Sequence, residues 1–395
     1  FSQDYYVGSA IRKLPPCSVP YTFPAHKVYK CSGVVELSAG DNLYPSTTST
    51  LVATGGFVLR GSNNIQGQSN KKLGLEGDIY SYYETNLDHV ILSGDVRSQN
   101  YIDIDNSDIN GKLTTDYGYV SVNGSTGSIG DVFSHNGVWM DGANVDGNVT
   151  TRNNIVSLTN VSGGVGDIYS QNGVWAENSN IEGDVTTTYQ TVTLIDVDGG
   201  VGDIYAQNGV RVENSDVEGD VTTQYGTITI EDSSGGFGDL NAQGKIEVID
   251  TTINGNLVNT WNGITLSGTT HITGDVTSFG DSNNGVVSFN DKASVDGICL
   301  YITVPEDACG SGSFPEPIAL YHFDESSWSG TAKDVLDSSG NGLHGVAKNG
   351  ATTAPSSNSS ALPSIDSLGT CGYGVFDNQQ NQYHLKYREH DYSRF

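Results

Sequence analysis

Residues 202–218 read GDIYAQNGVRVENSDVE. Apolar side chains alternate with polar ones in this stretch, first at Ile204, then at Val210 and Val212, and last at Val217. Alternation with a period of two residues is typical of a strand that buries one face. The stretch therefore predicts three short strands joined by tight corners. The repeat shows no 3.6-residue period, so we expect no helix in it.

Copies of this stretch recur with a period of 36 residues. Each copy begins with a glycine, a polar residue and an aliphatic residue, and two interleaved series both keep the period. The first series begins at Gly94, Gly130, Gly166, Gly202, Gly238 and Gly274, and the second at Gly111, Gly147, Gly183, Gly219 and Gly255. The elementary unit therefore alternates between a shorter form, as from Gly94 to Gly111, and a longer form, as from Gly111 to Gly130. Such a register across many copies is the signature of a solenoid.

A unit of this length fits one coil of a parallel β-helix and is too short for a propeller blade or a helical repeat. We predict an all-β chain with a parallel β-helix over residues 34–300, three short strands per coil. About 14 coils would make a rod roughly 65 Å long, since neighbouring strands lie about 4.8 Å apart. The longer step after Gly274 predicts an extra loop near Asp281–Gly285.

The charge of the chain argues against two classes of binding partner. The chain of 395 residues has 18 Lys and Arg against 46 Asp and Glu, a formal net charge of −28. Such an acid excess repels phosphate, which argues against nucleic acid and anionic membranes as partners. No apolar run reaches the roughly 18 to 20 residues of a membrane span. The chain begins at Phe1 and its one methionine is Met140, so we expect a processed, exported protein.

One column of the predicted solenoid is acidic. The residue after the leading glycine is, in order, Asp95, Lys112, Asp131, Asn148, Asp167, Asp184, Asp203, Asp220, Asp239, Asn256 and Asp275. Carboxylates about 4.8 Å apart repel by roughly 0.9 kcal/mol in water, so something must offset the repulsion. Either each Asp bonds the backbone of its own corner, or the column holds a line of Ca²⁺. Because Lys112 would bring positive charge to a metal position, we favour the corner and predict no cofactor.

A second column, six residues after the glycine, alternates asparagine with aromatic residues. Its members run Asn100, Tyr117, Asn136, Asn153, Asn172, Tyr189, Asn208, Tyr225, Gly244 and Trp261. Asparagine tolerates the left-handed backbone of a corner, and stacked amides can bond along the rod. The rings could form a strip for sugar or partner binding, or cover the corner. With Trp139 and Trp175, whose neighbours Val138 and Val174 must point inward, the candidate contact patch is Trp139, Trp175, Tyr189, Tyr225 and Trp261.

The cysteines lie near the ends of the predicted rod. Cys17 and Cys31 are close in sequence, as are Cys299 and Cys309, so we predict two local disulfides and leave Cys371 without an assigned partner. Residues 1–33 contain four prolines and no repeat, so we expect a cap there. Residues 301–316 are expected to be a closing loop and hinge.

Two resemblances add to this interpretation. Coils rich in Gly-Asp-Ile and Gly-Asp-Val resemble the β-helix of bactofilins, bacterial proteins that polymerise. Beyond the rod, residues 319–325 (ALYHFDE), 337–342 (DSSGNG) and 371–377 (CGYGVFD) resemble the opening strands of a concanavalin/laminin-G-like β-sandwich. The whole arrangement is similar to MshQ-like surface proteins, encoded with the mannose-sensitive haemagglutinin pilus. The resemblance implies a partial sandwich over residues 317–395, completed by further polypeptide or by another chain.

These features predict a bacterial cell-surface stalk that presents a lectin-like module, with an adhesive or structural role at a pilus or filament. Its expected partners are pilus or filament subunits, further copies of itself, or a surface glycan. The alternative is a filament subunit that polymerises end to end, which a capped N-terminus would disfavour. We expect no enzyme, because no nucleophile, metal or phosphate motif is found and no Asp/Arg cluster recurs at the repeat spacing.

Overall fold

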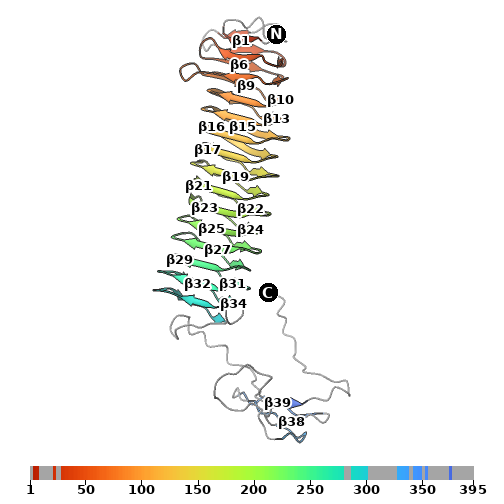
Figure 1. Cartoon of the computed structure of the whole chain (residues 1–395), viewed down its shortest axis with the longest axis vertical. Helices are drawn as coiled ribbons and strands as arrows, with labels where there is room; N and C mark the ends of the chain where they lie inside the picture. The colour runs from red at the N-terminus through yellow and green to blue at the C-terminus, as the bar shows by residue number, and fades with distance from the viewer. Residues whose placement is uncertain are drawn as a thin grey trace. The chain divides into compact units, whose positions relative to one another are not determined.

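The computed structural model describes residues 3–8, 21–23, 28–279, 286–300, 327–337, 341–348, 352–354 and 373–375. The chain divides into two compact units, Phe1–Ser311 and Gly312–Phe395. The described residues form strands and turns and contain no helix. In the first unit the strands stack as a parallel β-helix of about 14 turns (Figure 1). The predicted all-β, three-stranded coil is confirmed.

Each coil contributes a strand to three parallel faces. The first face contains β4 (Val35–Leu37), β7 (Phe57–Leu59), β10 (Ile79–Ser81), β13 (Val96–Ser98), the ends of β15 (Asp108–Thr115) and β16 (Val120–Ser134), β18 (Val149–Thr151), β20 (Ile168–Ser170), β22 (Val185–Thr187), β24 (Ile204–Ala206), β26 (Val221–Thr223), β28 (Leu240–Ala242), β31 (Leu257–Asn259), β34 (Val276–Ser278) and β37 (Cys299–Leu300).

The second face contains β1 (Asp4–Val7), β5 (Asn42–Pro45), β8 (Asn64–Gln66), β11 (Thr85–Asp88), β14 (Ile102–Asp105), the starts of β16, β17 (Val138–Val145), β21 (Val174–Asn180) and β23 (Thr191–Asp198), and β19 (Val156–Thr159), β25 (Gly209–Glu213), β27 (Thr227–Glu231), β29 (Ile246–Ile249), β32 (Ile264–Ser267) and β35 (Val287–Phe289).

The third face begins with β2 (Tyr21–Phe23), β3 (Val28–Cys31), β6 (Ser49–Ala53), β9 (Leu73–Glu76) and β12 (Val90–Ser93), and continues through the start of β15 and parts of β16, β17, β21 and β23. Isolated parallel bridges such as Val165 to Ile181 and Val201 to Val217 extend it. It ends with β30 (Thr252–Ile253), β33 (His271–Ile272) and β36 (Ser294–Val295).

The step from coil to coil alternates on the first face and is even on the second. On the first face the step from Val132 to Val149 is shorter than the step from Val149 to Ile168. On the second face Val138, Val156 and Val174 are evenly spaced. In every second coil the corner that leads from the first face to the second is one residue longer. In the same coils the path from the second face back to the first is also one residue longer. Together these two differences produce the alternating period.

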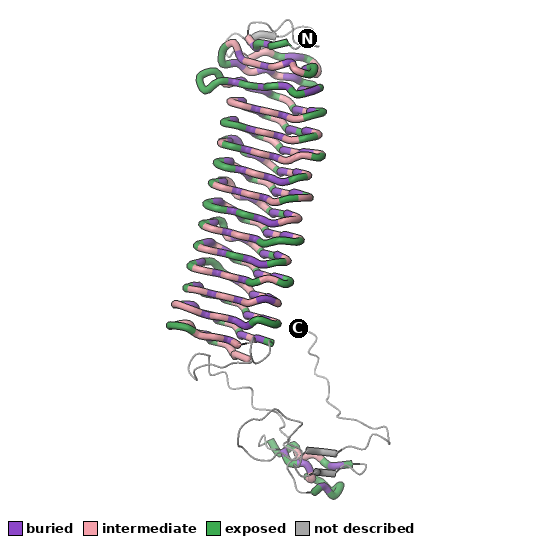
Figure 2. The backbone as a smooth tube through the Cα atoms, in the orientation of Figure 1, coloured by how far each residue is buried: buried purple, intermediate pink, exposed green. Residues whose placement is uncertain are grey.

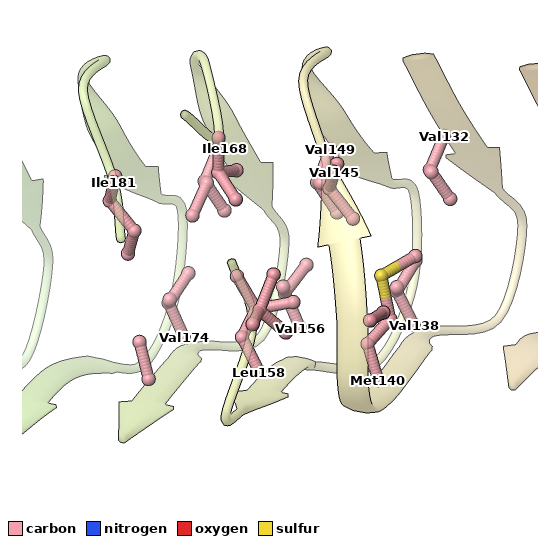
Figure 3. Close-up of a cluster of buried hydrophobic side chains, with 14 of the residues drawn as sticks. Val132, Val138, Met140, Val145, Val149, Val156, Leu158, Ile168, Val174 and Ile181 are labelled. Carbon is pink, nitrogen blue, oxygen red and sulfur yellow. The ribbon is translucent and has the colours of Figure 1, made fainter. Parts of the chain in front are cut away.

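The core is a continuous stack of aliphatic side chains from all three faces. Figure 3 shows Val132, Val149 and Ile168 of the first face pointing inward with Val156 and others of the second. All of these side chains are buried. Along each coil, buried positions alternate with half-exposed ones, and exposed residues gather at the corners (Figure 2). Each coil buries its apolar edge only against its neighbours, so stacking supplies the stability.

In most copies the leading glycine is required because the preceding coil approaches closely, through its backbone or through the Oδ1 atom of an Asp or Asn. A Cβ at Gly183 or Gly219 would lie under 3.0 Å from the backbone of the preceding coil. At Gly130 the nearest atom is the Lys112 Cγ, at 3.5 Å. Any side chain would therefore push most coils apart at this corner, which explains why the glycine recurs.

An unbroken column of left-handed residues lies at another corner, whereas the asparagine corner has positive φ angles one residue after the asparagine, at Gly137, Asn154, Gly173 and Gly209. The corner between the second and third faces has positive φ angles in every coil from Asn106 to Gly268, at an even spacing. These positions are Asn106, Gly124, Gly142, Asn160, Asn178, Asp196, Asn214, Asp232, Asp250 and Gly268. The asparagines of the column from Asn100 to Asn208 have no such φ, so the expectation that they supply the left-handed backbone was wrong.

The N-terminal end of the stack carries additional strands. Antiparallel β2 pairs with β3, with Thr22 opposite Tyr29, and β1 pairs with β5. Cys31 is buried at the end of β3. Its predicted partner Cys17 lies outside the described residues, as does Cys309, the predicted partner of Cys299. Both pairings stay predictions.

At the other end, the register locates the expected insertion. The step from Leu257 to Val276 has the length of the longer repeat unit, whereas the step from Ile264 to Val287 exceeds it. The additional residues therefore lie between Val276 and Val287, where the extra loop was predicted. The loop itself, near Asp281–Gly285, falls in the undescribed segment.

The described part of the second unit contains two antiparallel pairings. β38 (Thr352–Ala354) pairs with β39 (Tyr373–Val375), and Val335 bridges Gly345. The Asp337 carboxylate accepts the Leu343 N–H at 2.9 Å, across the predicted DSSGNG turn. Most of the residues expected to form the β-sandwich lie outside the described ranges, so that sandwich remains a prediction.

Candidate functional site

The acidic column forms a hydrogen-bonded ladder along the corner between the third and first faces, here called the acidic corner. The Oδ1 atom of each Asp or Asn accepts the backbone N–H of the equivalent residue in the next coil. Asp239 N donates to Asp220 Oδ1 at 2.7 Å, and Asp203 N to Asp184 Oδ1 at 2.8 Å. The ladder runs from Asp78 to the N–H of Ile298.

Lys112 interrupts the ladder, because its side chain carries no acceptor. Its Nζ instead donates to Asp131 Oδ2 at 2.6 Å. That hydrogen bond, together with the N–H of Asn148, lowers the pKa of Asp131, and the same bond raises the pKa of Lys112. Position 112 thus tolerates a cation by exchanging a backbone bond for an ion pair.

The acidic corner differs from expectation in which backbone each Asp bonds. Each carboxylate bonds the backbone of the next coil, whereas the sequence interpretation placed that bond within its own corner. The bonds offset the repulsion between neighbouring carboxylates because each negative oxygen faces an N–H dipole. Within the described ranges, no three His, Cys, Asp or Glu side chains are grouped as a metal site.

The corner between the first and second faces, here called the aromatic corner, carries the second column. Tyr117, Tyr189, Tyr225 and Trp261 lie on its longer form and are all exposed, Trp261 by 62%. The shorter form carries Asn136 or its equivalents. Of the five longer corners between residues 113 and 264, four carry an exposed ring and the fifth carries Asn153.

Buried hydroxyl groups fix the shape of this corner. The Oγ1 atom of Thr187 donates to the carbonyl of Gln190 at 2.9 Å, and that of Thr223 to Gly226 at 2.9 Å. The amide of Asn136 donates to the Tyr117 carbonyl at 2.7 Å, and Asn208 bonds the Tyr189 carbonyl in the same way. At these two positions the asparagine amides bond backbone carbonyls across coils.

Trp139 and Trp175 lie on the second face, away from the aromatic corner. Val138 and Val174 are buried as expected, Trp175 is 41% exposed and Trp139 is half-buried. They are two coils apart, with Ser157 between them in register. The five predicted contact residues therefore occupy two neighbouring strips of the rod.

Trp139 belongs to a packed aromatic cluster. Its ring meets that of Tyr119 edge-on at 5.7 Å, and Tyr119 stacks on Tyr101 at 5.0 Å. The Tyr119 hydroxyl donates to Asp103 Oδ2 at 3.2 Å. Burial, reinforced by the Asp103 carboxylate, raises the pKa of Tyr119 to about 12. Packing on neighbouring rings therefore accounts for the position of Trp139.

A shallow groove opens on the second face beside the aromatic corner. It is lined by Thr191, Thr193, Gly209, Arg211, Thr227 and Thr229, among others. Gly209 pairs with Thr191 on one side and Thr227 on the other, and a Cβ at Gly209 would lie 3.0 Å from the Thr227 carbonyl oxygen. Sequence reasoning missed this groove, although a glycine evenly spaced between two threonines of adjacent coils is a signal that could have revealed it.

Comparison of the chain with protein-family models, with curated proteins and with solved structures finds no match. In the part of the chain that the structure describes, no helix is long and apolar enough to span a membrane.

Proposed function

We propose that the chain is an exported bacterial cell-surface stalk that presents a lectin-like module. Its role would be adhesive or structural, at a pilus or filament. The proposal assigns the β-helix to mechanical reach and the second unit to presentation. A stacked β-helix suits a stalk because every coil bonds only its neighbours along one axis.

The observation that carries the proposal is the N-terminal end of the stack. End-to-end growth of a β-helix needs free parallel edges. Here antiparallel β2 occupies the edge of β3, and β1 occupies the edge of β5. The third face therefore begins with an antiparallel strand that a further parallel coil would have to displace, whereas β1 continues the second face in parallel register with β5. This supports a stalk over a filament subunit that polymerises end to end.

The proposal is tested on intact cells of the bacterium that produces the chain. Antibodies against the rod should label cells without permeabilisation. A variant that lacks residues 317–395 should still reach the surface but lose cell attachment, because it keeps the stalk and lacks the presented module. Labelling only after permeabilisation, or unchanged attachment by the variant, would count against the proposal.

A further inference from the structure

We propose that the groove at Gly209, with the rings of Tyr189 and Tyr225 beside it, binds a linear neutral polysaccharide on the side of the rod. The inference concerns a surface of the β-helix itself. It does not depend on the lectin-like module or on where the protein is displayed.

Charge segregation is the first argument. The molecule has a net charge of −28, yet from Gln99 to Gly263 the aromatic corner carries one carboxylate, Asp116. Arg97 pairs with that carboxylate at 2.9 Å. Side-chain amides take the place of charges on most coils, at Gln99, Asn100, Asn136, Asn153, Asn154, Gln171, Asn172, Gln190, Gln207, Asn208, Gln224, Gln243 and Asn262. Apart from Asp116, Arg152 and Lys245, this edge of an acidic protein is amide-rich and uncharged, which complements a neutral, hydroxyl-rich ligand.

The arrangement of rings is the second argument. Tyr189 and Tyr225 project from corners two coils apart, and therefore lie about 10 Å from each other along the rod. Two sugar residues of an extended β-1,4-linked chain advance by a similar distance. Aromatic faces stack on the apolar faces of sugar rings, as they do on other flat partners. The two tyrosines can therefore contact alternate sugars of one chain that runs parallel to the rod axis.

Polar groups around the groove supply the remaining contacts. Threonine hydroxyls line it at Thr191 and Thr193 on strand β23 and at Thr227 and Thr229 on strand β27. Gln207 donates to Gln224 at 3.4 Å, and Gln224 donates to the Tyr225 hydroxyl at 3.0 Å. These bonds hold the Tyr225 ring at the edge of the groove before any ligand arrives. The Arg211 guanidinium is already paired with Glu213, so the groove offers little attraction to an anionic glycan.

Titration calorimetry of the full chain with cellohexaose, a neutral β-1,4-linked hexasaccharide, tests the inference. Tyr189→Ala and Tyr225→Ala should each weaken binding roughly tenfold, because each removes one stacking ring. Tyr225→Phe should bind more tightly than Tyr225→Ala, because it keeps the stacking ring and loses only the bond from Gln224 to the hydroxyl. Tyr117→Ala is the matched control, an exposed tyrosine of the same column several coils away, and should have no effect.

Four results would overturn the inference. The first is no binding at millimolar cellohexaose. The second is binding that survives the Tyr189→Ala, Tyr225→Ala double variant, which would place the sugar site elsewhere. The third is concentration-dependent dimerisation of the parent that both alanine variants abolish, which would make the strip a contact between copies of the chain. The fourth is an equally tight complex with an acidic hexagalacturonate, which would contradict the claim that the ligand is neutral.

Discussion

At the scale of single residues, one oxygen atom per coil links the acidic corner. The Oδ1 atom that accepts the next N–H is present in Asp and in Asn alike, which is why Asn148 and Asn256 occupy the ladder without disturbing it. Charge is therefore incidental to the bond, whereas the acceptor is required. The Asp residues of the ladder also make this corner of the rod acidic, so it repels other anions.

Substitutions at Asp220 test this distinction. Asp220→Asn keeps the acceptor and should leave the free energy of unfolding within about 0.5 kcal/mol of the parent. Asp220→Ala leaves the Asp239 N–H without its partner and should cost about 1 kcal/mol, a modest value because water can reach the site. Chemical denaturation followed by circular dichroism measures both. Equal losses for the two variants would show that the negative charge, and not the acceptor, matters.

The ion pair at the break in the ladder gives a pH-dependent prediction. Lys112 lowers the pKa of Asp131, so the pair contributes stability above the ordinary carboxyl pKa and loses it as the pH falls through the lowered value. Lys112→Met should raise the pKa of Asp131 toward its ordinary value. Carboxyl NMR of Asp131 measures the shift, which should shrink in high salt because both side chains are half-exposed. An unchanged pKa would contradict the role assigned to Lys112.

At the scale of the coil, corners decide what each face can carry. A glycine that touches the preceding coil, a left-handed residue and a corner of alternating length together set three directions for the chain. Most of the longer corners project rings, and the glycine corner brings the acidic ladder within bonding distance. The inward-facing strand positions then need only an aliphatic side chain, which is Val, Ile or Leu in most coils.

Two glycines of the same column provide a matched test. Gly219→Ala places a Cβ against the backbone of Gly202 and should destabilise the rod by about 1–3 kcal/mol through overpacking. Gly130→Ala meets the flexible Lys112 side chain at 3.5 Å and the Gly111 carbonyl oxygen at 3.8 Å, both ordinary contacts, and should be neutral or slightly stabilising. Thermal unfolding of both variants decides the matter. Similar melting temperatures would mean that close approach does not explain the glycine column.

The repeat in the sequence predicted the coils, their number and the position of the insertion, because period-2 alternation reports burial directly. It could not predict that Asp220 bonds Asp239 in the next coil, since a carboxylate has acceptor sites for either backbone. The left-handed column at Asn178 and its equivalents was missed, because asparagine occurs at two corners and composition cannot tell them apart. The groove at Gly209 depends on which residues meet across coils, which only the register reveals.

At the scale of the whole β-helix, we expect stability to be a sum over neighbouring coils that does not depend on a bound ion. The Oδ1 atom of each carboxylate in the ladder accepts an N–H, which offsets the repulsion without calcium. We expect the melting temperature of the rod, followed by far-ultraviolet circular dichroism of the full chain, to change by no more than a few degrees between excess chelator and millimolar Ca²⁺. A shift of tens of degrees would make the acidic corner a calcium site.

The central claim of the stalk proposal is the assembly state, because antiparallel β2 at the N-terminal end of the third face should prevent end-to-end growth. Electron microscopy of the purified chain at high concentration tests it most directly. We predict separate rods, each with a β-helix roughly 65 Å long, without growth from the end that β1 and β2 occupy. Long filaments in which the coil repeat continues unbroken from one molecule to the next would contradict the account and identify the chain as a polymerising subunit.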